Sequence, residues 1–247
     1  MKLQTVRVRE FKSVWDSNSF EIDRVACLVG KNEAGKTAVL QALYRLNPIV
    51  ERDGNFDVTD DYPRSEVENY QQDVESGRRQ HAVVVEATFR LEQPELKAIG
   101  DEYGDGVLAK PEVVVSKGYA RGDSSTCQLF VNVLVAEHVL VKNLVKRSEL
   151  PEALPAKATK RGTLAQLSKY LTEIGQKQGE AVAAAQAAAN QLQDEAEKAA
   201  ALQKSKALAE SEQAKALRAR LTELLKSKSL GLHIWQTILR PHFPKPA

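Results

Sequence analysis

The pattern of apolar and polar residues in the first fifty positions predicts three strands and a helix. Apolar and charged residues alternate over 3–11, which indicates a strand with one buried face. Residues 20–22 predict a second, short strand. The unbroken apolar run Val25–Val29 is typical of a central strand buried on both faces, as in a parallel sheet. Helical spacing follows over 36–46, and Pro48 ends that helix.

The next hundred residues combine a polar connection with a predicted antiparallel β-meander. Residues 51–80 are acidic and polar, so we expect an exposed connection with a short helix near 65–76. A further helix is predicted over 94–103, with Pro94 in its first turn. Three β-rich runs supply the meander, at 81–91, 112–120 and 128–136.

The last third of the chain has the composition of a long helix. Leucines recur at spacings of three and four residues on both sides of an alanine-rich stretch, and no glycine or proline occurs from Glu180 to Ser229. This pattern predicts a coiled-coil arm over 163–230, bent at Gly175 or Gly179, after a proline-marked linker at 151–162. The alternative is a low-complexity helix that is only partly ordered.

Composition places the chain among ordinary globular proteins. It has 247 residues, 43% of them hydrophobic and 28% charged, and a net charge of +2. This charge does not by itself favour nucleic acid, although the basic stretch 140–170 leaves DNA open as a partner. No apolar run approaches the roughly 20 residues that span a bilayer, and no signal peptide is recognisable. We therefore expect a cytoplasmic protein without a membrane partner.

Cysteine and histidine usage gives no sign of a metal centre. The two cysteines, Cys27 and Cys127, lie in or beside apolar runs. We interpret both as small buried hydrophobic side chains in a reducing compartment. The four histidines are scattered, and no Cys/His spacing is typical of zinc.

The most specific motif is the octet Gly30–Thr37, which fits the phosphate-binding pattern G-x-x-x-x-G-K-[ST] in full. A predicted strand precedes it and a predicted helix follows it, which is the context that the motif requires. Backbone N–H groups in such a loop, at the positive end of a helix, bind phosphate. The sequence therefore predicts a nucleotide-binding protein.

Each position of the octet has an expected role. Gly30 and Gly35 would permit positive φ angles and a close approach to phosphate. Lys36 would contact the β- and γ-phosphates, and the Thr37 hydroxyl would bind Mg²⁺. Asn32 and Glu33 would lie at the crest of the loop, facing the γ-phosphate or a second subunit. The expected binding residues in and beside the loop are Gly30, Asn32, Glu33, Ala34, Gly35, Lys36, Thr37 and Ala38.

The order of these features resembles the ABC-type ATPase heads of the SMC/RecF group. The sequence Val29–Thr37, followed by Leu40–Leu43, is most similar to the AAA-type ATPase domain of OLD-family (overcoming-lysogenization-defect) proteins. The segment Asp61–Arg64 also resembles a segment of some members. The resemblance is strong over residues 1–64 and architectural beyond them. By similarity to the family, Lys12 in Phe11–Ser13 is a candidate nucleotide contact; a solvent-exposed lysine in a turn is the alternative.

The resemblance implies a particular fold and set of partners. We expect an α/β P-loop NTPase lobe of the ABC/SMC type over 1–150, then the linker, the helical insertion, and a truncated return to the ATPase core at 231–247. The family implies ATP and Mg²⁺ as ligands and head-to-head homodimers. Full-length members act on DNA, in repair or phage defence, and usually carry a C-terminal nuclease domain.

The residues that would complete hydrolysis are not recognisable. ATP hydrolysis requires an acidic residue that holds Mg²⁺ and a group that orients water. In the family, an apolar strand ending in two acids and an LSGG-like signature in the partner head supply them. Glu86 and Glu137 end apolar runs, but both fall in the predicted meander, where alternation points Glu86 outward. We expect no catalytic residue in this chain and infer a truncated head that binds ATP with weak turnover.

Two other functional classes compete with an ATPase head. A non-catalytic interaction module could pair through its coiled coil while its loop binds nucleotide. A GTPase is disfavoured because no N-K-x-D stretch is present to recognise guanine.

Overall fold

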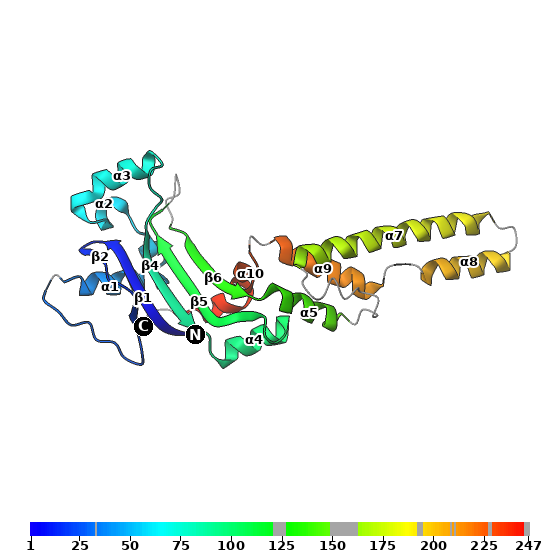
Figure 1. Ribbon diagram of the computed structural model, residues 1–247, viewed down its shortest axis with the longest axis horizontal. Helices are drawn as coiled ribbons and strands as arrows, with labels where there is room; N and C mark the ends of the chain where they lie inside the picture. The colour runs from blue at the N-terminus through cyan, green and yellow to red at the C-terminus, as the bar shows by residue number, and fades with distance from the viewer. Residues whose placement is uncertain are drawn as a thin grey trace. The chain divides into compact units, whose positions relative to one another are not determined.

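The computed structural model describes residues 1–32, 34–120, 127–148, 163–191, 195–207, 209, 211–226 and 229–244. These residues form two compact units. The first unit comprises residues 1–98, 110–134 and 234–247, and the second comprises 99–109 and 135–233. The predicted linker 151–162 lies outside the described residues. The chain is a mixed α/β protein with an antiparallel sheet (Figure 1).

A sheet forms the centre of the first unit. Its strands are β1 (Lys2–Phe11), β2 (Val14–Asp16), β3 (Phe20–Glu21), β4 (Val83–Arg90), β5 (Leu108–Gly118) and β6 (Leu129–Val135). The order is β2-β1-β4-β5-β6, and β3 also pairs with β1. The pairs β1–β2, β1–β3, β1–β4 and β4–β5 are antiparallel. The predicted strand 3–11 and the consecutive strands of the meander are therefore confirmed.

Alternation along the strands determines which side chains form the core. On β1, Val6 and Val8 are almost fully buried, as the sequence pattern predicts. On β4, Val84, Val85 and Ala87 are fully buried, whereas Glu86 is exposed. The outward position that the sequence predicts for Glu86 is thus correct.

The run Val25–Val29 does not form the central strand that the sequence predicts. Val25 and Val29 are 87% and 88% exposed, and no described residue pairs with this segment. Cys27, predicted to be buried, is exposed as well. A strand needs backbone partners on at least one edge, and the described part of the chain offers none here. The residue types of this run favour a strand, but no described strand pairs with it.

Several short helices accompany the sheet in the first unit. They are α1 (Lys36–Tyr44), the 3₁₀ turn η1 (Glu51–Gly54), α2 (Val58–Asp61), the 3₁₀ turn η2 (Arg64–Glu66) and α3 (Val67–Glu75). The helices predicted at 36–46 and 65–76 are confirmed, and α4 (Gln93–Tyr103) confirms that at 94–103. Residues 51–80 are less exposed than expected, because Tyr62 and Tyr70 stack in the core with ring centroids 4.2 Å apart.

The second unit is helical. It contains α5 (Glu137–Arg147), which the sequence did not reveal, and α7 (Leu164–Asn190), α8 (Glu195–Ala207) and α9 (Glu212–Lys226). Helix α7 packs against both α8 and α9. The expected single helix over 180–229 is wrong, because separate helices replace it. The expected bend is also wrong, since α7 continues through Gly175 and Gly179.

The end of the described chain returns to the first unit. Helix α10 (Leu230–Ile234) continues into a π-helical turn at Trp235–Leu239 and a 3₁₀ turn at Arg240–His242. The Phe243 ring packs edge-on against Phe89 of β4 and against Trp235, with centroids 5.3 and 5.1 Å apart. This last helical segment helps to fill the core, because Ile234, Trp235 and Leu239 are buried.

Candidate functional site

The octet Gly30–Thr37 joins the exposed apolar run to helix α1, and all of it except Glu33 lies within the described residues. Asn32 and Ala34 are exposed, and Ala34 N–H donates to the Lys31 carbonyl at 3.2 Å, which closes a turn. The loop is therefore a surface feature that ends at the N-terminus of α1. The predicted helix after the motif is present, and the predicted strand before it is not.

Gly35 is the N-cap of α1 and requires glycine for two independent reasons. Its φ angle is 82°, in the left-handed region that residues with a Cβ adopt at a cost. A Cβ at this position would also lie 2.6 Å from Cγ2 of Val14. Gly30 differs from the expectation: it has no positive φ, and a Cβ there would make only an ordinary contact with Ala34 at 3.6 Å.

The Lys36 side chain folds back over the loop. Its ammonium donates to the carbonyl oxygens of Gly30 and Lys31 at 2.7 and 2.6 Å. These bonds hold the Lys36 ammonium at the Gly30–Lys31 end of the loop. A flexible ammonium can exchange such carbonyl partners for phosphate oxygens, because both accept the same N–H donors.

The start of α1 has the electrostatic character of an anion site. No acidic residue occupies the first turn of α1, so no carboxylate within that turn offsets the positive end of the helix dipole. Thr37 is exposed there and could present its hydroxyl to a cation held by phosphate. Ala38 is buried toward the sheet, so only its backbone N–H could serve the site.

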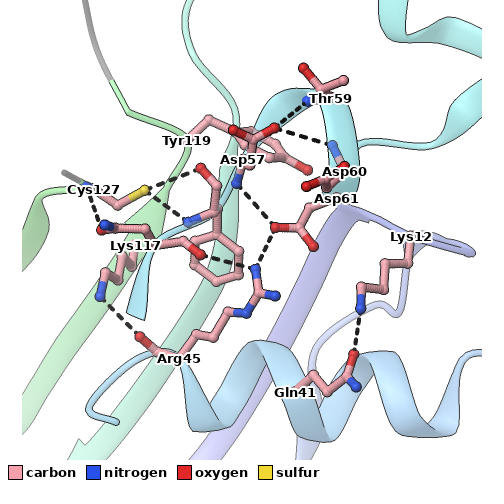
Figure 2. Close-up of polar contacts among 12 residues, drawn as sticks. Lys12, Gln41, Arg45, Asp57, Thr59, Asp60, Asp61, Lys117, Tyr119 and Cys127 are labelled. Carbon is pink, nitrogen blue, oxygen red and sulfur yellow. Dashed lines mark hydrogen bonds and ion pairs between the residues drawn. The ribbon is translucent and has the colours of Figure 1, made fainter. Parts of the chain in front are cut away.

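Lys12 lies against the same helix. Figure 2 shows its ammonium donating to Oε1 of Gln41 on α1, at 2.8 Å. The backbone of Lys12 has a φ of 53°, and its N–H donates to the carbonyl of Asp61 at 2.6 Å. Ser13 and Val14, the next residues, approach Gly35 at the start of α1. The structure therefore places Lys12 against α1, and its contact with a nucleotide stays a prediction.

A buried polar cluster behind this turn was missed by sequence reasoning. Asp61 is 3% exposed, and its carboxylate pairs with Arg45, the C-cap of α1 (Figure 2). The Arg45 guanidinium also donates to the Asn55 carbonyl at 3.0 Å and lies 5.4 Å from the ring centroids of Phe11 and Phe56. The one available signal was the motif Asp61–Arg64, which the resemblance singled out without a role.

Two further buried groups border this cluster. Lys117 of β5 donates from Nζ to the Arg45 carbonyl at 3.0 Å, and burial lowers the pKa of its ammonium. The Tyr119 hydroxyl donates to the Glu10 carbonyl at 2.6 Å, and burial raises the pKa of that phenol well above its usual value. The raised pKa keeps the Tyr119 phenol protonated at neutral pH, so its hydroxyl acts as a hydrogen-bond donor.

The described residues outside the loop add no metal site and no membrane segment. No group of three or more His, Cys, Asp or Glu side chains lies close enough, among the described residues, to hold an ion. Within the same ranges, no helix is both long and apolar enough to cross a bilayer. Glu137, which ends an apolar run in the sequence, begins α5 and accepts a bond from the Leu164 N–H at 2.8 Å.

Comparison with known proteins does not assign the chain to a family. No protein-family model matches it. No curated protein sequence matches it either.

Proposed function

We propose that this chain is the ATP-binding N-terminal lobe of a P-loop NTPase of the OLD/SMC-like type, with a helical coiled-coil arm. The observation that carries the proposal is the arrangement at the start of α1. Gly35 takes the left-handed conformation at the N-cap, and the Lys36 ammonium donates to the loop carbonyls of Gly30 and Lys31. A helix N-terminus with no acid in its first turn and with a lysine folded over the preceding loop suits a polyphosphate.

The proposed ligand is ATP with Mg²⁺. Backbone N–H groups of the loop and the Lys36 ammonium would hold the phosphates, and Thr37 would supply a hydroxyl to the cation. The acidic strand end that would hold Mg²⁺ and the LSGG-like signature, which complete hydrolysis in the resembling family, are not recognisable in the sequence. We therefore propose binding with weak or absent turnover by this chain alone.

A nucleotide titration tests the proposal. Isothermal calorimetry of ATP with Mg²⁺ should give a saturable isotherm for the wild-type chain. Loss of a charge-assisted hydrogen bond is worth about 1.5–3 kcal/mol, so Lys36→Ala should weaken binding by about tenfold to a hundredfold. Lys97→Ala removes an exposed lysine on α4, away from the loop in sequence, and should leave the affinity unchanged.

Three outcomes would contradict parts of this proposal. Absence of binding by the wild-type chain, or equal binding by Lys36→Ala, would refute the phosphate loop. Equal affinities for ATP and GTP would refute the adenine assignment. Robust turnover that Lys36→Ala abolishes would show that the chain supplies its own hydrolytic groups.

The assembly part of the proposal follows from the resemblance. Heads of this type close as homodimers on two nucleotides, and DNA is the further partner that we propose. Light scattering with and without ATP tests this step, because nucleotide-driven pairing should double the mass. An unchanged mass at saturating ATP would contradict it.

A further inference from the structure

The Lys12 turn is held in a conformation that a lysine does not adopt by itself. Its φ of 53° lies in the left-handed region, where the Cβ of a non-glycine residue is crowded against the backbone at a cost in free energy. The bond from the Lys12 N–H to the Asp61 carbonyl, at 2.6 Å, compensates part of this cost. Such strain persists only where the surroundings determine it, and here the surroundings begin with Asp61.

Asp61 is itself fixed by contacts on several sides. Its buried carboxylate pairs with Arg45 and accepts the Asp57 N–H at 3.0 Å (Figure 2). Asp57 is also the N-cap of the short helix α2, where its carboxylate accepts the N–H groups of Thr59 and Asp60. Arg45 is the C-cap of α1, and Lys117 caps its carbonyl in turn. A buried carboxylate is costly unless it is paired, so this geometry is strongly determined. Asp61 thus joins the end of α1 to the Lys12 turn.

The turn held in this way runs along the start of α1. Val14 contacts Gly35 at the N-cap, and Lys12 contacts Gln41, which lies on the same helix face as Thr37 four residues earlier. The Lys12 ammonium therefore lies about one turn from the residue proposed to meet Mg²⁺. A shift of the turn would move Lys12 relative to the phosphate loop.

We propose that Asp61 is a positioning residue for the nucleotide site. Its carbonyl holds the strained Lys12 turn, and its carboxylate holds the Arg45 end of α1, so that Lys12 and the phosphate loop form one preorganised unit. This inference rests on the proposed nucleotide binding and adds Asp61, Arg45 and Gln41 to the residues that determine affinity. None of the three need touch the nucleotide.

Two measurements on a set of variants test the inference. The first is the dissociation constant of a fluorescent ATP analogue with Mg²⁺. The second is the rate at which an acylating reagent modifies Lys12 in the nucleotide-free protein, read by mass spectrometry. Asp61→Asn keeps size and backbone but removes the charge that holds Arg45. Asp60→Asn, an exposed acid in the same helix, is the matched control.

We expect Asp61→Asn to weaken nucleotide binding about tenfold, as the loss of a preorganised contact of about 1.4 kcal/mol would. Lys12 acylation should become severalfold faster, and Asp60→Asn should change neither quantity. Gln41→Ala alters only an exposed side chain and should raise Lys12 acylation without affecting folding. In a Lys12→Ala background, Asp61→Asn should weaken binding by less than twofold, because both changes remove the same contact.

The outcomes separate this inference from the proposed function. If Lys36→Ala weakens nucleotide binding while Asp61→Asn leaves it unchanged, nucleotide binding by the loop is supported and the role of Asp61 is refuted. If the full tenfold loss persists in the Lys12→Ala background, Asp61 acts by another route and the inference is again refuted. If the wild-type chain binds no nucleotide, the proposed function fails and the affinity role of Asp61 fails with it. The acylation rates alone then report whether Asp61 holds Lys12.

Discussion

Two valine-rich segments of this protein differ in burial: one is buried in the sheet and the other is exposed. Val83–Ala87 lies inside the sheet, between β1 and β5, with Val84 and Val85 fully buried. Val25–Val29 lies on the surface, with both terminal valines almost fully exposed. The runs differ in their neighbours rather than in their own propensity. An apolar run indicates that a segment requires burial, and only the rest of the fold determines whether the chain can provide it.

The exposed run leads directly into the octet Gly30–Thr37, the proposed phosphate loop. In the first run, backbone groups bond to strands on both sides. In the second, no backbone hydrogen bond joins residues 23–29 to any described residue. Consequently, the loop is anchored through α1 and the Lys12 turn. The position of the proposed site is therefore set by the contacts of Gly35, Gln41 and Arg45.

Hydrogen exchange should show the largest difference between the two runs. Amides of central strands open with free energies near that of global unfolding, at least about 5 kcal/mol, which slows exchange by a thousandfold or more. Amides of 84–89 should show this protection. Those of 25–29 should exchange within about tenfold of an unstructured peptide. Mass spectrometry of short peptides measures both, and equal protection of the two runs would refute the comparison.

Truncation of one valine in each run should give the next largest difference. Val85→Ala removes two buried methyl groups and leaves a cavity, which should lower the free energy of unfolding by about 2 kcal/mol. Val25→Ala removes exposed groups and should change it by less than about 0.5 kcal/mol. Urea unfolding followed by circular dichroism gives both values. A cost for Val25→Ala as large as that for Val85→Ala would mean that 25–29 is buried in solution.

Sequence patterns predicted the elements whose signal is local. Alternation within β1 and β4 and helical spacing within α1 are contained in the segments themselves, and each is confirmed. The strand 25–29 was wrong because pairing depends on residues elsewhere. The single helix over 180–229 was wrong because uniform helical propensity does not specify where a helix ends. Local signal therefore predicts elements better than it predicts their boundaries or partners.

Some features of the candidate site could be predicted from local sequence, and others could not. The need for glycine at Gly35 could be predicted, because the motif fixes both its residue type and its place before a helix. The positive φ expected at Gly30 was wrong, because the same residue type serves two positions with different backbones. The Asp61–Arg45 pair could not be predicted, since an acid in a polar stretch usually faces solvent. Its partner Arg45 lies 5.4 Å from the ring centroids of Phe11 and Phe56, which come from other segments of the chain.

The two cysteines extend the comparison to chemical reactivity, with a smaller expected effect. Cys27 is exposed in the centre of the unpaired run. Cys127 is partly buried, and its Sγ accepts the Phe56 N–H at 3.0 Å. Access limits thiol exchange, so a chromogenic disulfide should react with Cys27 at least about tenfold faster. Cys27→Ser should leave only the slow phase and Cys127→Ser only the fast phase. Equal rates for the two single-cysteine variants would contradict the exposure of 25–29.

The smallest expected effect concerns β2, a short edge strand. Unlike 25–29, β2 is paired with a neighbouring strand, β1. Its Asp16 carboxylate accepts two bonds from Arg7 of β1, at 3.0 and 2.5 Å, and these bonds lower its pKa from 3.8 to about 2. Because the folded pKa is lower than the unfolded one, the pair adds stability above about pH 4 and loses it as the pH falls toward 2. Both groups are solvent-exposed, so the gain is small and sensitive to salt.

This acid dependence can be isolated with one variant and one control. Urea midpoints of the wild-type chain and Arg7→Ala should differ slightly at neutral pH and converge as the pH falls from about 4 to about 2. Added salt should reduce the difference at neutral pH. Arg24→Ala, which removes an exposed arginine from the unpaired segment, should parallel the wild type throughout. A constant offset between wild type and Arg7→Ala across this range would mean that Arg7 stabilises β2 by packing. The pairing of β2 would then depend on apolar contacts. Apolar residues alone do not produce a strand at 25–29.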